Sequence, residues 1–192
     1  MWILGSHNSW SYMTPMKWWM KPIAFMARCQ NTDIRTQYEK YGVRCFDLRI
    51  RFDKYGIGVV SHGIVEYCET FRVRQDLEWL AGKGDVIVRV MHEVRSSRQY
   101  RARRKDLFVR FCKALEEDYR HIHFWCGREL YGWDYDYRFS GIEPTCEEHY
   151  ASVDRPRLLT WWPWLYAALR NRRIRNNGTD KEILLIDFVD RE

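Results

Sequence analysis

Short apolar runs recur along this 192-residue chain, with amphipathic segments between them. Each alternating or continuous apolar run predicts a strand, since successive side chains on a strand face opposite sides. Strands are expected at residues 2–4, where Gly5 ends the run, at 43–52 with an extended partner at 57–60, and at 85–94, 122–126 and 182–189.

Apolar side chains three and four residues apart predict helices between these strands. One is capped by Asn31 or Thr32 and runs to about Tyr41, where Gly42 ends it. Others are expected at residues 70–81, 103–119 and about 165–172. This alternation is typical of an α/β fold. The chain is long enough for one domain with a sizeable core, but short for a complete eight-unit α/β barrel.

The stretch from Gly42 to Gly63 carries the most informative polar residues. Asp47 and Arg49 are two positions apart on one predicted strand, so a carboxylate and a guanidinium leave the same face of the sheet. The glycines that follow permit a tight turn, and His62 lies at the end of the second extended segment. The alternative interpretation is a surface hairpin with a salt bridge and a histidine that is merely polar.

Two other predicted strands contribute polar residues. His7 lies at the exit of the first strand, next to Asn8. On the third long strand, Arg89, Met91 and Glu93 share one face because successive side chains alternate. If that face lines a cavity, Arg89 and Glu93 are close to the chemistry.

The composition is that of a folded, basic protein. Hydrophobic residues make up 46% and aromatic residues 16%, which argues against a disordered chain. The net charge is +6, and basic residues are concentrated at residues 95–105 and 155–175. These segments fit either an anionic partner, such as a phospholipid surface or nucleic acid, or solvated helix faces.

The six cysteines show no Cys-x-x-Cys spacing, and the opening residues lack the basic start and long apolar core of a signal peptide. We therefore expect free thiols in a reducing compartment, and a protein that is cytoplasmic or peripheral at a membrane surface. No apolar run approaches the ~18 residues of a membrane span.

Residues 13–26 hold two prolines and a cluster of amphipathic residues: Lys17, Trp18, Trp19 and Lys21. The segment is a poor strand and an imperfect helix, so we expect a rim loop. Tryptophan and lysine together suit a membrane–water interface, which makes these four candidate membrane-surface residues. The alternative is a lid that packs on the protein's own core. Residues 131–139, which are aromatic and acidic, fit either a ligand-lining loop or a lid.

Three motifs follow one another in the sequence: G-S-H-N-S at residues 5–9, G-V-R-C-F-D-L-R at 42–49 and S-H-G at 61–63. Together they resemble the X domain of phosphatidylinositol-specific phospholipase C. The similarity runs from residue 3 to about residue 94 and returns at I-L-L-I-D-F-V, residues 183–189. The resemblance implies a compact, distorted (β/α) barrel of the TIM type, shorter than the usual eight-unit barrel. It also implies a single catalytic domain over residues 1–192.

The resemblance implies a mechanism with two histidines. In the family, the residue matching His7 is the general base on the inositol 2-hydroxyl, and the residue matching His62 is the general acid towards the diacylglycerol oxygen. Imidazole suits both roles because it titrates near neutrality. Asp187 matches the aspartate that holds the first histidine in the bacterial enzymes, and Asp47 matches the acidic residue beside the phosphate. The implied products are diacylglycerol and a cyclic inositol phosphate.

Arg49 places the sequence with the bacterial, metal-independent type. The eukaryotic enzymes have a calcium-binding carboxylate there, whereas the bacterial enzymes have an arginine that can contact the phosphoryl oxygens. Met91 falls where eukaryotic members carry another calcium-binding glutamate and bacterial members a lysine that contacts inositol. We therefore expect no metal and no cofactor, with Asn8, Arg89 and Glu93 as substrate-binding residues.

The sequence thus favours a phosphoric diester lyase or hydrolase that cleaves phosphatidylinositol, or a related inositol phospholipid, at a membrane surface. One alternative is a related phosphodiesterase acting on glycerophosphodiesters or sphingolipids, although such enzymes use carboxylate-bound metal and Arg49 beside Asp47 leaves few ligands. Another is a non-catalytic lipid- or nucleic-acid-binding module. Such a module needs no acid–base pair, and the sequence does not favour nucleic acid as a partner.

Overall fold

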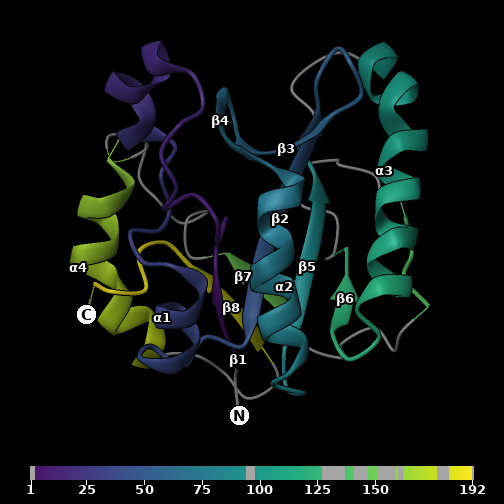
Figure 1. The fold of residues 1–192 in the computed structure, drawn as a ribbon. Helices are drawn as coiled ribbons and strands as arrows, with labels where there is room; N and C mark the ends of the chain where they lie inside the picture. Colours follow the sequence, from purple (N-terminus) through teal and green to yellow (C-terminus); the bar gives the residue numbers. More distant parts are fainter. Residues whose placement is uncertain are drawn as a thin grey trace.

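One curled sheet with helices around it forms the part of the chain that the structure describes (Figure 1). The computed structural model describes residues 3–93, 98–126, 137–140, 147–150, 159, 162–176 and 182–191. Within these ranges the sheet has eight strands. Most of the predicted loop or lid at residues 131–139 lies outside them.

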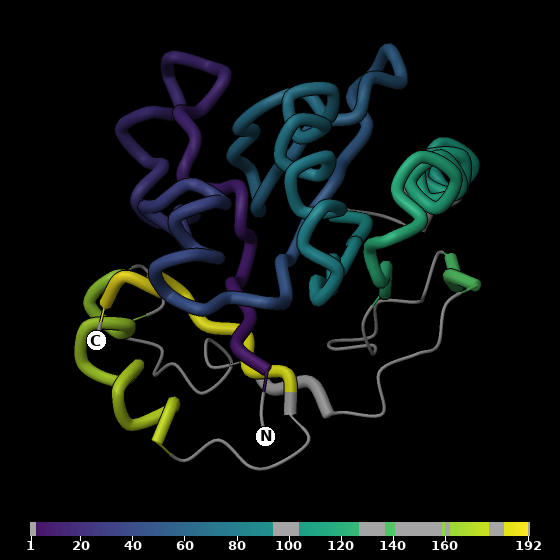
Figure 2. The backbone as a smooth tube through the Cα atoms, turned by 60° about the horizontal axis from the view of Figure 1, so that its bottom comes forward, coloured from purple at the N-terminus to yellow at the C-terminus, as the bar shows by residue number. Residues whose placement is uncertain are grey.

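Six strands run parallel, in a spatial order that differs from the order along the chain. This order is β7 (Glu147–Tyr150), β8 (Glu182–Ile186), β1 (Ile3–Ser6), β2 (Cys45–Phe52), β5 (Ile87–His92) and β6 (His123–Trp125). The first and last of them along the chain, β1 and β8, lie side by side (Figure 2). The predicted α/β fold, a compact and distorted barrel with fewer than eight units, is confirmed for the described residues.

An antiparallel hairpin continues from the carboxyl end of β2. β3 (Gly58–His62) pairs with the last residues of β2, and β4 (Val65–Glu69), which the sequence did not predict, pairs with β3. The turn between β3 and β4 contains Gly63 at φ +57°, a conformation that favours glycine.

The helices lie on the outside of the sheet. They are α1 (Ile34–Glu39), α2 (Arg74–Ala81), α3 (Arg98–Asp118) and α4 (Pro163–Asn176), with the short 3-10 helices η1 (Trp18–Met26) and η2 (Thr70–Val73). In Figure 1, α2 crosses in front of β2, α3 lies beyond β5 and β6, and α4 lies on the opposite side near α1. Among the described helices, none is both long and apolar enough to cross a bilayer.

Two local predictions were wrong. The segment at residues 13–26, expected to be a rim loop, contains the 3-10 helix η1, which includes Pro22. The cap of α1 is Asp33 rather than Asn31 or Thr32, because the Asp33 carboxylate accepts the N–H of Thr36 at 3.0 Å.

Alternation along the strands divides the core in two. On β2, Phe46, Leu48 and Ile50 belong to the main apolar cluster, together with helix residues such as Leu77 and Phe108. A smaller apolar cluster gathers the residues that alternate with them: Cys45, Trp125, Ile183 and Leu185, with Ile3 and Ile87 beside them. Its packing is close, since a Cβ added at Gly5 would lie 2.5 Å from Leu185 Cδ2.

The strand face that carries the smaller apolar cluster points into the barrel. The next residues on that face, towards the carboxyl ends of the strands, are polar. Two residues beyond Gly5, Cys45, Ile87 and Leu185 stand His7, Asp47, Arg89 and Asp187. The barrel therefore has an apolar floor and a polar layer nearer the carboxyl ends of its strands.

Candidate active site

The polar layer collects charged residues from four strands. The pairing of β2 with β5 sets Asp47 opposite Arg89, and His7 and Asp187 follow directly after β1 and β8. All four side chains are buried. Buried charge is costly unless it is paired and hydrogen-bonded, so their contacts define what the layer can do.

Asp47 is the centre of the layer. Its Oδ2 accepts hydrogen bonds from Arg49 Nε at 2.7 Å and from the backbone N–H of Asn8 at 3.0 Å. Its Oδ1 accepts one from Arg89 Nη1 at 2.7 Å. Burial alone would raise the pKa of Asp47, but the charges of Arg49 and Arg89 outweigh burial and hold that pKa well below its ordinary value. Asp47 is therefore ionised.

Arg49 lies between two carboxylates. Besides its bond to Asp47, its Nη1 donates to Glu93 Oε2 at 3.3 Å. Glu93 in turn accepts the backbone N–H of Gly63 at 2.9 Å. Burial would raise the pKa of Glu93, but the charge of Arg49 opposes it and the pKa is lowered. The Arg49 guanidinium is thus held in one orientation at the edge of the site.

His7 is oriented by an aspartate that is far away in the sequence. Its Nδ1 lies 2.6 Å from Asp187 Oδ1. An ionised carboxylate only accepts hydrogen bonds, so Nδ1 carries the proton and Nε2 of the neutral ring keeps its lone pair. Nε2 lies 3.9 Å from Asp47 Oδ2 and therefore faces the polar layer. An imidazole held in this way by a carboxylate is suited to act as a base.

The two candidate histidines meet because β1 and β3 share one edge of β2. β5 occupies the other edge from Cys45 to Ile50, while β1 pairs with Cys45 and Phe46 and β3 pairs from Ile50 onwards. β1 runs parallel to β2 and β3 antiparallel, so the two strands approach each other end to end. His7 and His62 stand at the facing ends, with ring centroids 5.1 Å apart and an interplanar angle of 85°.

His62 is the more accessible of the two histidines. Its Nδ1 lies 2.8 Å from the carbonyl oxygen of Ala27, so this nitrogen donates its proton there. Burial lowers the pKa of His62, and the nearby His7 ring and Arg49 guanidinium lower it further, to about 4. In the ligand-free protein, His62 is therefore neutral at pH 7.

Asn8 offers a buried amide at the rim of this layer. Neither its Oδ1 nor its Nδ2 has a hydrogen-bond partner within the described ranges, and the residue adopts φ +43°. Asparagine tolerates that conformation better than most residues. Because buried polar groups are nearly always hydrogen-bonded, the amide is available to a ligand.

The other two expected substrate-binding residues, Arg89 and Glu93, are buried and already bonded within the polar layer. Arg89 and Glu93 share the predicted inward face of the chain at β5, as does the half-buried Met91. Arg89 is fully buried behind Asp47, and Glu93 is bonded to Arg49. Their contact with substrate stays a prediction.

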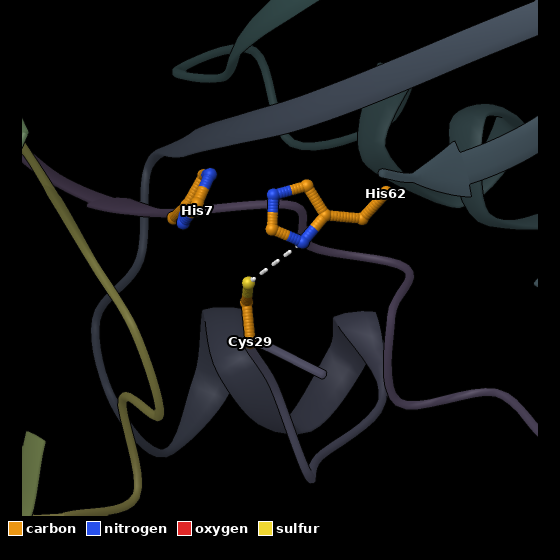
Figure 3. A group of neighbouring side chains, drawn as sticks. All are labelled: His7, Cys29 and His62. Atoms are coloured by element: carbon orange, nitrogen blue, oxygen red, sulfur yellow. Dashed lines mark hydrogen bonds between the residues drawn. The ribbon is translucent and has the colours of Figure 1, made fainter. Parts of the chain in front are cut away.

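Two loop residues near the histidines were missed by sequence reasoning. Gln30 donates from Nε2 to the carbonyls of His7 and Ile186, at 3.2 and 2.9 Å, and so ties the loop after β1 to the end of β8. The Cys29 thiol lies 3.5 Å from His62 Nδ1, and Figure 3 shows it directed at the gap between the histidines. No period or motif singles out either residue.

The candidate membrane-surface residues lie on and next to η1. Trp18 is 79% exposed and Trp19 51%, whereas Ala24 of the same helix is buried against the hairpin. Lys17 forms a 2.6 Å ion pair with Glu66 of β4. The helix therefore packs on the protein through one face and presents two indoles to solvent.

A cleft of about 410 Å³ opens between η1 and α4. Its lining includes cationic and aromatic residues: Lys21, Arg28, Phe25, Trp164, Phe188 and Arg191. Two of its lining residues, Arg28 and Phe188, directly precede Cys29 and directly follow Asp187, respectively, in the sequence.

Solved structures of bacterial phosphatidylinositol-specific phospholipase C are similar to this chain. One from Staphylococcus aureus aligns with a TM-score of 0.60 and 15% identity, over 97% of this chain and 85% of that one. One from Listeria monocytogenes aligns with a TM-score of 0.57 and 18% identity, over 97% and 87%. The likeness is one of fold. No protein-family model matches the chain, and no curated protein does.

Barrels of this kind carry their active sites at the carboxyl ends of the parallel strands. In this chain that end holds the polar layer with His7, Asp47 and Asp187, and His62 is brought to it by the hairpin. The layer is therefore the candidate active site.

Proposed function

We propose that this chain is a phosphoric diester lyase that cleaves phosphatidylinositol, or a related inositol phospholipid, to diacylglycerol and a cyclic inositol phosphate. The observation that carries the proposal is the meeting of His7 and His62 at a ring separation of 5.1 Å, with Arg49 fixed beside them. A binding module would have no use for a carboxylate-oriented imidazole facing a second imidazole. The fold shared with bacterial enzymes of that name supports the same reaction.

In the proposed reaction, His7 is the base. Its Nε2 takes the proton of the inositol 2-hydroxyl, whose oxygen forms a bond to phosphorus. Asp187 holds the ring and stabilises the imidazolium that results. The bond between phosphorus and the diacylglycerol oxygen breaks, and His62 gives that oxygen a proton.

His62 must be protonated to act as the acid. Its pKa of about 4 belongs to the ligand-free site, where burial and the neighbouring His7 and Arg49 side chains disfavour the cation. A phosphodiester anion beside the rings acts in the opposite sense, because a nearby negative charge favours the imidazolium. Substrate binding therefore charges the acid, which ties protonation of His62 to an occupied site.

Arg49 takes the role that calcium has in other phospholipases. Calcium needs about 6–8 oxygen ligands, but Asp47 and Glu93, the carboxylates nearest to Arg49, are both bonded to its guanidinium. This donor set does not fit calcium. The fixed guanidinium stabilises the charge that grows on the phosphoryl oxygens, a role worth about 3–4 kcal/mol for a preorganised donor.

The lipid part of the substrate is assigned to the η1 side. Trp18 and Trp19 are placed to enter the membrane–water interface, and the cationic cleft beside Lys21 suits anionic head groups. The enzyme then acts while bound peripherally to the membrane.

Phosphorus NMR of the products formed from phosphatidylinositol, with and without a chelator, tests substrate, product and metal dependence together. We expect a cyclic phosphate in both samples. His7→Ala and His62→Ala should each lower turnover by about 10²–10⁴-fold while circular dichroism shows an intact fold. Turnover close to wild type in either variant contradicts the mechanism, and activity that requires added calcium contradicts the role of Arg49.

A further inference from the structure

The two candidate catalytic histidines share their surroundings with a thiol. One ligand atom each of His7, Cys29 and His62 lies within 4.8 Å of the other two. Figure 3 shows the three side chains converging from three separate segments, with Cys29 Sγ 3.5 Å from His62 Nδ1. The proposed reaction uses the histidines and gives the thiol no task.

Cys29 is held in place by its backbone. Its N–H donates to Ser11 Oγ at 2.9 Å, and its carbonyl accepts the N–H of Phe188 at 2.5 Å. The residue is 1% exposed. The backbone of Cys29 is therefore fixed on both sides, and its thiol, which also donates to the Ala27 carbonyl at 3.6 Å, lies beside His62.

We propose that His7, Cys29 and His62 form a zinc site, and that zinc bound there switches off the acid–base pair. Zinc prefers imidazole and thiolate ligands, and sites with three protein ligands leave a fourth position for water. On binding, the Cys29 thiol releases its proton to solvent and no electron is transferred. The inhibition, but not the binding, rests on the function proposed above.

The geometry of His7 favours this site. Metal-bound histidines almost always donate their other ring nitrogen to a carboxylate or carbonyl, which fixes the ring and aims the free lone pair. His7 Nδ1 already bonds to Asp187 Oδ1 at 2.6 Å, so this ring has the outer partner that a zinc ligand needs and presents Nε2 to the metal.

The distances require only small movements. Zinc–ligand bonds of about 2.0–2.3 Å place ligand atoms roughly 3.5 Å apart in a tetrahedral site, and the three atoms already lie within 4.8 Å of one another. Rotation of the side chains closes the difference. His62 is only half-buried, so the ion has an entry path on its side.

The charge around the cluster also suits a divalent ion. Carboxylates outnumber guanidiniums by one in the polar layer: Asp47, Asp187 and Glu93 against Arg49 and Arg89. A zinc ion with the Cys29 thiolate adds one positive charge and balances the layer. The site differs from the calcium position, which fails because its oxygen ligands are bonded to Arg49.

Cobalt(II) titration tests the binding without any substrate. Tetrahedral cobalt bound to a thiolate gives an intense charge-transfer absorption, which zinc should abolish by displacement. We expect this signal in the wild-type protein and in Cys126→Ser, a matched variant that removes a half-buried thiol outside the cluster. Cys29→Ser and His62→Ala should each weaken cobalt binding by about 10–100-fold or more.

A wild-type protein that gives no such signal overturns the proposal, and this result does not depend on any variant folding. A signal that survives unchanged in Cys29→Ser, or that vanishes in Cys126→Ser instead, overturns it as well.

The second arm measures turnover of phosphatidylinositol, each protein being compared with itself in zinc and in chelator. Saturating zinc should lower wild-type turnover by at least about 10-fold, and chelator should restore it. Cys29→Ser should need about 10–100-fold more zinc for half inhibition. If neither the wild-type protein nor any variant cleaves the lipid, the proposed function is wrong. The cobalt titration still decides whether the zinc site exists. If cobalt binds through Cys29 but zinc leaves turnover intact, the regulatory part of the inference is refuted.

Discussion

Replacing Asp47 by asparagine tests whether the charge network of the site also stabilises the fold. The buried carboxylate accepts 2.7 Å hydrogen bonds from both Arg49 and Arg89. Asp47→Asn keeps the shape but removes the charge, so two buried guanidiniums lose the carboxylate that they share. Removing one partner of a buried ion pair costs about 3–5 kcal/mol, and we expect the unfolding free energy at pH 7 to fall by that amount.

The pH dependence of this loss has a defined sign. The folded pKa of Asp47 lies below its unfolded value of about 3.9. The stability that its charge contributes is therefore complete above that value and is lost as the pH falls through the folded pKa. The difference in unfolding free energy between wild type and Asp47→Asn should be constant from about pH 5 to about pH 8 and shrink below about pH 4.

His62 must be kept apart from this effect. Its pKa is lowered to about 4 in the folded protein, so its contribution to stability is lost as the pH falls below the unfolded pKa of about 6.5. It titrates in both proteins, and subtracting one unfolding free energy from the other removes most of its contribution.

Urea unfolding followed by circular dichroism measures these quantities. The matched control is Asp85→Asn, because Asp85 is an exposed aspartate that accepts a 2.8 Å bond from Arg44 Nε. A surface pair of this kind is worth less than about 1 kcal/mol. If Asp47→Asn costs no more than the control, or if the difference grows as the pH falls, the reasoning about the buried network is refuted.

Three further changes separate catalysis from stability. Asn8→Gly should lower turnover by about 10–100-fold and leave the unfolding free energy unchanged, because φ +43° suits glycine and the lost amide has no partner among the described residues. Asp187→Asn should lower kcat by about 10²–10⁴-fold with a much smaller change in KM, because His7 loses the carboxylate that orients it. Trp18→Ala combined with Trp19→Ala should weaken sedimentation with phosphatidylinositol vesicles and spare hydrolysis of water-soluble cyclic inositol phosphate.

Each of these three predictions can be contradicted by a specific result. A less stable Asn8→Gly protein would mean that the amide has a structural partner. A rise in KM with unchanged kcat in Asp187→Asn would show that the aspartate serves binding rather than the base. Equal loss on vesicles and on the soluble substrate would give the tryptophans a role in folding or as a lid.

The residues that the strands contribute to the candidate site were predictable, because successive side chains on a strand must face opposite sides of the sheet. This alternation placed Asp47 and Arg49 on one face of β2, and Arg89 on the facing row of β5. The same alternation puts His92 on the opposite face, where its ring stacks on Phe108 with ring centroids 4.8 Å apart. A one-residue error in either strand would have sent every one of these side chains to the other side.

The loops were not predictable, for a physical reason. Cys29 and Gln30 reach the site through hydrogen bonds between side chains and backbone, which follow no period along the sequence. β7 was missed as well, because Glu147–Tyr150 is short and mostly polar and gains its place only by pairing with β8. Spacing along the chain also cannot show that β1 and β3 meet end to end on one edge of β2.

The pairing of β1 with β8 sets an order of events during protein synthesis. His7 and Asp187 are 180 residues apart in the sequence, and β1 has β2 on one edge and β8 on the other. While the ribosome is still making the middle of the chain, β1 has an open edge, which is a template for pairing with foreign strands. The imidazole of His7 then lacks the carboxylate that orients it. A nascent chain therefore gains an oriented base only when β8 pairs with β1. This pairing covers the open edge of β1 and also completes the polar layer.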